Sequence, residues 1–125
     1  MFNFKNVSLA ATALSGVLFV ILLLAPELIF FIFSIEGSEA AKLLSRRAAM
    51  LFLGLAIITY LGRDAVHSAL RQAVCVGMAA TMFGLALTGT YEFARGYAGF
   101  GILLAVIAEI GFGVAFTRIW LAGRK

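Results

Sequence analysis

One glutamate within an apolar stretch has the surroundings that most strongly indicate chemistry. Glu109 lies within Ile102–Phe116, a segment that contains no other charged residue. A carboxyl group in hydrocarbon is costly and normally faces the interior of a helix bundle, where it pairs, binds a cation or stays protonated. Glu109 is therefore a candidate for handling protons or cations, or for capturing a cationic substrate. The alternative is a structural hydrogen bond to a neighbouring helix, for example to Ser15 or Thr81.

Two adjacent arginines form the second candidate site. If their helix ends at Leu61, a full span counted back places Arg46 and Arg47 about one turn inside the membrane boundary. Long arginine side chains reach the headgroup layer from that depth. Alternatively, one guanidinium pairs with Glu27, with Glu92 or with a lipid phosphate, because its planar fork matches their oxygens. Neighbouring helix residues point about 100° apart, so we expect one arginine to face lipid and the other to face protein.

The remaining residue types that carry chemistry lack partners at a suitable spacing. His67 and Cys75 are the single histidine and cysteine, and neither has a second ligand at the spacing of a metal or haem site. No serine is accompanied by a base in the pattern of a nucleophilic enzyme. We therefore expect no metal and no other cofactor, and we favour a non-enzymatic protein over an enzyme.

The elements that must position these residues are transmembrane helices. The chain has 125 residues, of which 63% are hydrophobic and 13% are charged, and its mean hydropathy is +1.07. Soluble domains carry about 25% charged residues, so too few polar side chains are present to cover a water-facing surface. The ten Lys and Arg residues are scattered along the chain, which excludes a nucleic-acid-binding domain.

Four apolar stretches are each close to the ~20 residues that a membrane-spanning helix requires. They cover residues 7–24, 43–61, 69–90 and 97–121. Because backbone amides in hydrocarbon must be paired within each segment, we predict an all-α, single-domain bundle of four transmembrane helices. Counted from Tyr97, Glu109 lies about 18 Å along the fourth span, near the middle of the membrane.

A proline and a Phe-rich patch follow the first span. One continuous helix from Val7 to Ile35 would be about 43 Å long, which exceeds the ~30 Å hydrocarbon core. We expect Pro26 to break the helix and to leave residues 27–36 as a short helix at the interface or against the bundle. The alternative is a long, tilted and kinked first helix. Ser38 is then expected to cap the second span.

Small residues at helical spacing mark two of the spans, where they favour close helix packing. This spacing does not distinguish packing within the chain from oligomerisation. The glycines that we predict to pack are Gly77, Gly84, Gly111 and Gly113. Three more glycines reduce the side-chain volume at the start of the fourth span: Gly96, Gly99 and Gly101.

The charge distribution predicts the orientation of the chain. With four spans, both termini and the loop around residues 62–68 lie on one side of the membrane. That side carries six basic residues, and the other side carries four. The six are Lys5, Arg63, Arg71, Arg118, Arg124 and Lys125. Because orientation follows the excess of Lys and Arg, both termini are predicted to be cytoplasmic. The first span is longer than the 7–15 apolar residues of a signal peptide, so we expect it to be retained.

The segment Ser45–Leu55, with the sequence SRRAAMLFLGL, follows a Pro-Glu-Leu boundary after the first span. It resembles small uncharacterised four-helix proteins of the bacterial inner membrane, and the resemblance implies that location and no activity. The chain is also similar to small multidrug transporters, which have four helices and an essential membrane glutamate. In that family the glutamate lies in the first helix, whereas here the first span has no acid and Glu109 lies in the fourth.

Three functions are compatible with these patterns. The leading one is a non-enzymatic accessory or structural protein that packs with itself or with a larger membrane complex, because most of the signals are packing signals. The second is a small proton-coupled or cation transporter that uses Glu109. The third is a lipid-modifying enzyme in which Arg46 or Arg47 holds a headgroup. Membrane lipids are expected partners in every case, and nucleic acid in none.

Overall fold

The computed structural model describes residues 3–124, and this part of the chain is helical without a strand. Its helices are α1 (Phe4–Leu24), α2 (Pro26–Phe33), α3 (Glu39–Leu61), α4 (Ala69–Ala94) and α5 (Ile102–Ala122). All except the short α2 are long and apolar enough to cross a membrane. The predicted all-α architecture with four spans is confirmed, and the protein is a multi-pass membrane protein. Lys125, part of the predicted charge balance, lies outside the described residues.

Three of the long helices begin at a capping side chain. Asn3, Ser38 and Ser68 each accept a hydrogen bond from the backbone N–H three residues further on, at 2.8, 3.0 and 3.2 Å. Such caps satisfy one of the backbone donors that the first helical turn leaves unpaired. Ser38 therefore begins α3 as predicted.

The break between α1 and α2 lies at the proline. Ala25 leaves the helical conformation with φ −144° and ψ 59°, and Pro26 begins the next helix, where its missing N–H is not needed. Ser34 then ends α2 in the left-handed conformation, with φ 53°. The predicted break and short helix are therefore present, and the alternative of one long kinked helix is wrong.

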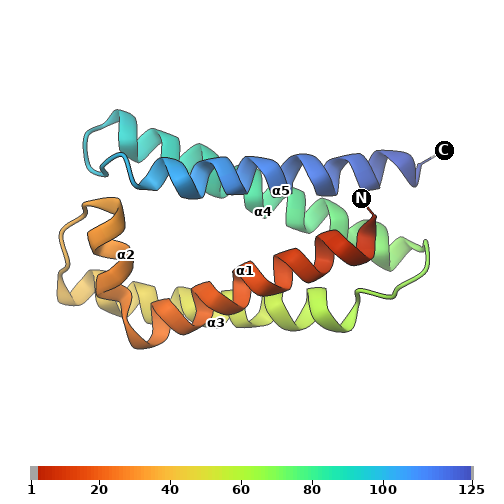
Figure 1. Ribbon diagram of the computed structural model, residues 1–125, viewed down its shortest axis with the longest axis horizontal. Helices are drawn as coiled ribbons and strands as arrows, with labels where there is room; N and C mark the ends of the chain where they lie inside the picture. The colour runs from red at the N-terminus through yellow and green to blue at the C-terminus, as the bar shows by residue number, and fades with distance from the viewer. Residues whose placement is uncertain (1–2, 125) are drawn as a thin grey trace.

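The four long helices form two antiparallel hairpins, α1 with α3 and α4 with α5. Figure 1 shows the two hairpins as separate layers that diverge toward the end of the molecule where α2 lies. The start of α1 and the end of α5 lie together at the opposite end. Among the long helices, contact between the layers is mainly that of α1 with α5.

The buried core lies at the end where the two chain ends meet. Its members come from α1, α4 and α5, and the most deeply buried large side chain is Phe116, with no exposed surface. Met82 and Cys75 of α4 are buried beside it. This side-chain core joins the two hairpins at what we call the terminal end of the molecule.

The α2 end is joined by backbone contact instead. The Gly99 N–H donates a 2.6 Å hydrogen bond to the Phe33 carbonyl oxygen, which links α2 to the turn between α4 and α5. A Cβ atom on Gly101 would overlap the Ile32 carbonyl oxygen, so only glycine fits there. In Figure 1, α2 crosses from the α1–α3 layer to this turn.

The fourth span begins five residues later than the sequence analysis places it, at Ile102 instead of Tyr97. Gly96 adopts a positive φ of 82°, which ends α4 in a turn that favours glycine. Gly99 and Gly101 then make the close contacts with α2. These glycines therefore form the connection between α4 and α5 and do not reduce the side-chain volume of the fourth span.

Candidate functional site

A small pocket with a largely apolar lining lies between α4 and α5 on the side where α2 docks. Its volume is about 200 Å³, and it holds two carboxyl groups, Glu92 of α4 and Glu109 of α5. Thr88 lies one helical turn before Glu92, and Phe33 at the end of α2 lines the same pocket. The helical spacing of α4 therefore places a hydroxyl group and a carboxyl group opposite the acid of α5.

Glu109 is half-buried and has no hydrogen bond or ion pair within residues 3–124. As the eighth residue of α5, it lies about 10 Å from the start of that helix, less than the 18 Å counted from Tyr97. The two hydroxyl groups considered as structural partners do not contact it. Thr81 donates to the Gly77 carbonyl oxygen of its own helix, and the buried Ser15 hydroxyl has no partner among the described residues.

Glu92, in contrast, is paired. Its Oε1 accepts from Arg95 Nε at 3.2 Å and lies 3.2 Å from the second guanidinium nitrogen, one turn along the chain. The same guanidinium stacks on Tyr97, 4.3 Å from the ring centre. The pocket thus has a neutralised carboxylate at the helix end and an unpaired carboxyl group deeper along α5.

Arg46 and Arg47 lie on the exposed surface of α3, about 10 Å from its start. Neither forms an ion pair within the described part of the chain, and Glu92 is instead held by Arg95. Glu27, the other acid considered as a partner, lies in the first turn of α2. The structure therefore does not bring the two arginines together with an acid.

The four glycines singled out for helix packing divide into two groups. A Cβ atom on Gly113 would meet the ring of Phe83 at 2.8 Å, so this glycine packs α5 against α4. At the other three positions, Gly77, Gly84 and Gly111, a Cβ atom would meet nothing within 4 Å. At Gly89, which the spacing argument did not include, a Cβ atom would lie 3.0 Å from the Val106 side chain, so this glycine also packs α4 against α5.

A hydroxyl pair that the sequence analysis missed joins α1 to α3. Thr12 and Thr59 share a 2.7 Å hydrogen bond between their side chains, and Thr59 has no exposed surface. Each hydroxyl also contacts a backbone carbonyl of its own helix. Polar side chains of this kind hold membrane helices together. Unlike Glu109, these two residues are uncharged, so nothing in the sequence marked them as unusual within their spans.

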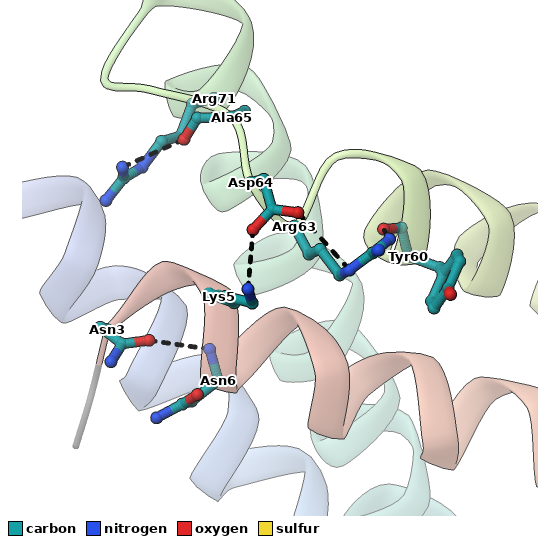
Figure 2. A network of polar contacts seen from close by, with 8 residues as sticks. All are labelled: Asn3, Lys5, Asn6, Tyr60, Arg63, Asp64, Ala65 and Arg71. Atoms are coloured by element: carbon teal, nitrogen blue, oxygen red, sulfur yellow. Dashed lines mark hydrogen bonds and ion pairs between the residues drawn. The ribbon is translucent and has the colours of Figure 1, made fainter.

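A second polar cluster lies at the terminal end. Figure 2 shows Asp64 between Lys5 and Arg63, with distances of 3.0 and 3.7 Å. Arg71 stands apart from this group, and its guanidinium points away from Asp64. It lies 4.6 Å from the centre of the Phe4 ring and donates a 3.3 Å hydrogen bond to the Ala65 carbonyl oxygen.

Chemically, the acidic pocket is suited to holding a proton or a cation. An unpaired carboxyl group in an apolar helix pair binds a proton, a cation or a cationic group of another molecule. Within residues 3–124, no group of three or more His, Cys, Asp or Glu side chains is placed to hold a metal ion. Comparison with known proteins found no matching family model, no similar curated protein and no similar solved structure.

Proposed function

We propose that this protein is a non-enzymatic subunit that assembles within the membrane, with further copies of itself or in a larger membrane complex. The observation that carries the proposal is the open glycine face of α4. Gly77 and Gly84 lie seven residues apart, nearly in line along the helix, and neither packs against the chain itself. Small residues in line let a second helix approach closely, and such contacts drive association between membrane helices.

The arrangement of the hairpins supports the same proposal. The two layers share a side-chain core at the terminal end and a backbone contact at the α2 end. In the most apolar 18-residue segment of α3, 11% of the residues are buried within the chain, against 33% for α5. An additional helix can therefore pack against α3 or α4 without displacing an existing contact. The resemblance to four-helix bacterial proteins and the charge balance favour the bacterial inner membrane, with both termini cytoplasmic.

The experiment is to fill the open face and to measure the size of the assembly. Gly77→Leu combined with Gly84→Leu fits the fold of the single chain, because both Cβ positions are open. We expect the wild-type protein to migrate on native gels as a complex larger than one chain, and the double variant to migrate as a monomer. Val76→Leu, an exposed α4 position about 100° around the helix, is the matched control and should leave the complex intact.

Two results would contradict the proposal. The first is a wild-type protein that is monomeric in membranes by in-membrane cross-linking. The second is a double variant whose complex has the same size as the wild type. Helical content measured by circular dichroism shows whether the double variant is folded, so that loss of assembly is separated from unfolding.

A second function, a small proton-coupled or cation transporter, is favoured by one observation. Glu109 lines a pocket with Glu92 and Thr88 and lacks a protein partner among the described residues. The pocket is lined by Glu92, near the end of α4, and by Glu109 of α5, so it offers carboxylate oxygens at two places. A carboxyl group that only fastened two helices together would have a hydrogen-bond partner.

Glu109→Gln tests this second function, because it keeps the shape of the side chain and removes the charge. In vesicles loaded with a pH-sensitive dye, a transporter should lose ion-driven proton movement in this variant while its assembly is unchanged. Glu39→Gln, at an acid whose side chain is 89% exposed, is the control and should behave as the wild type. Equal proton movement by Glu109→Gln and the wild type would exclude a transport role for Glu109.

A further inference from the structure

The terminal end carries more positive than negative charge around Arg71. One pocket of about 330 Å³ is lined by three basic side chains, Lys5, Arg63 and Arg71, and by the single acid Asp64. Asp64 is already bound by Lys5 and Arg63 (Figure 2). Arg71 is thus the cation of this pocket that has no acid within residues 3–124.

Within residues 3–124, most N–H donors of the Arg71 guanidinium also lack a hydrogen-bond acceptor. A guanidinium has five N–H donors, and one of those of Arg71 meets a protein acceptor, the Ala65 carbonyl oxygen at 3.3 Å. Its Nε is buried and has no hydrogen-bond partner in the described structure. The Phe4 ring lies against the guanidinium, with 4.6 Å between Cζ of Arg71 and the ring centre. Arg71 also lines a second pocket of about 330 Å³, which includes His67.

An apolar groove begins beside this basic cluster. The groove has a volume of about 400 Å³ and runs between α1 and α5. Asn6 lines both this groove and the pocket that contains Arg71, so the two are adjacent. Deeper in the membrane the groove is lined by small residues, among them Ala10, Ala108 and Gly111. Gly111 leaves open space there, with no atom within 4 Å of a Cβ position.

We propose that this surface is a binding site for one anionic phospholipid. The phosphate is bound by the guanidinium of Arg71, whose fork matches two phosphate oxygens, and Lys5 and Arg63 add positive charge. One acyl chain lies in the groove between α1 and α5. Free phosphate shares the headgroup chemistry, but the apolar groove next to the basic pocket favours the lipid. The site is independent of the open glycine face of α4 and goes beyond the proposed assembly.

The experiment measures lipid retention by the full-length protein. Purified protein is exchanged into nanodiscs of dioleoylphosphatidylglycerol or dioleoylphosphatidylcholine, transferred to detergent and examined by native mass spectrometry. We expect the wild type to retain one phosphatidylglycerol per chain, and phosphatidylcholine much more weakly. Arg71→Gln should weaken phosphatidylglycerol binding by about tenfold, since it removes a bidentate, charge-assisted contact. Arg71→Lys should give an intermediate loss, because a single ammonium replaces the fork.

Two further variants make the test specific. Arg124→Gln removes the same charge from an exposed position at the terminal end that lines none of these pockets, and it should retain the lipid as the wild type does. Gly111→Leu fills the groove without touching Arg71, and it should lower lipid retention while the helical content is unchanged. This variant keeps the proposal testable if Arg71→Gln does not fold.

Competition with inorganic phosphate shows whether the site binds a phospholipid or free phosphate. At millimolar concentration inorganic phosphate should not displace the bound phosphatidylglycerol, because it has no acyl chain to occupy the groove. The proposal is overturned if phosphatidylglycerol and phosphatidylcholine are retained equally, or if Arg71→Gln and Arg124→Gln have the same effect. It is also overturned if inorganic phosphate displaces the lipid while Gly111→Leu has no effect on retention.

Discussion

The two ends of the molecule join the same pair of hairpins by different physical means. At the terminal end, side chains such as Phe116 and Met82 pack into one core, and a charged cluster around Asp64 lies at the same end. At the α2 end, backbone lies against backbone, with Gly101 beside the Ile32 carbonyl and Gly99 bonded to Phe33. Side chains can repack around a changed neighbour, whereas a backbone contact has no freedom to adjust.

This difference shows how a small membrane protein holds two hairpins together without a continuous core. Lipid is as apolar as a leucine side chain, so the hydrophobic effect does not drive these helices together. Close packing and hydrogen bonds remain, and in this chain they are concentrated at the two ends. The two ends should therefore respond differently to substitutions of similar size.

The largest effect is expected from Phe116→Ala at the terminal end. The substitution leaves a cavity in the core that joins α1, α4 and α5, and cavity formation of this size costs about 3 kcal/mol of unfolding free energy. Phe116→Leu keeps most of the volume and should cost less than about 1.5 kcal/mol. Unfolding in mixed detergent micelles, followed by circular dichroism, measures both values. Equal costs for the two variants would show that Phe116 does not pack tightly.

Gly101→Ala at the α2 end is expected to have the next largest effect. Its φ of −59° suits alanine, so the cost comes from the overlap of the new methyl group with the Ile32 carbonyl. Overpacking of this kind costs about 2 kcal/mol. Gly54→Ala, in an open position of α3, is the control and should stabilise its helix by up to ~1 kcal/mol.

The comparison of the two alanine variants in thermal unfolding is direct, because both add a single methyl group. We expect Gly101→Ala to lower the unfolding temperature and Gly54→Ala not to lower it. If both variants unfold at the wild-type temperature, α2 does not lie against the turn as described.

The smallest effect is expected from Asp64→Asn, again at the terminal end. The side chains of Lys5 and Asp64 are 57% and 61% exposed, and such surface ion pairs contribute between 0 and about 1 kcal/mol. The loss should shrink further when salt is added, because exposed charges are screened. Thermal unfolding of the variant and the wild type at low and high salt provides the measurement. A loss that is large and independent of salt would mean that Asp64 has a structural role beyond its ion pairs.

Features that depend on nearby residues could be predicted from the sequence. The four spans follow from the length of apolar runs, the break at Pro26 from its missing donor, and the cap at Ser38 from its position before the helix. Glu109 could be recognised as unusual because it is the one acid within an apolar stretch. Each of these properties is set within a few residues along the chain.

Features that depend on distant residues could not be predicted in this way. The presence of Glu109 and Glu92 in one pocket depends on the register of α5 on α4, which the spacing of small residues does not specify. The same holds for Thr12 with Thr59. Glycine spacing identified Gly113, which packs within the chain, but it equally marked Gly77, which does not. The late start of the fourth span could not be predicted for the same reason, because Gly99 and Gly101 contact the distant segment around α2.

The central claim is that the two ends of the molecule lie on opposite faces of a membrane, and cysteine labelling tests it most directly. In a Cys75→Ser background, single cysteines are placed at exposed positions: His67 and Arg124 at the terminal end, and Glu36 and Tyr97 at the α2 end. With an impermeant maleimide on intact bacterial cells, we expect labelling at Glu36 and Tyr97, and at His67 and Arg124 only after permeabilisation. Labelling of His67 and Arg124 from different faces would contradict the four-span structure.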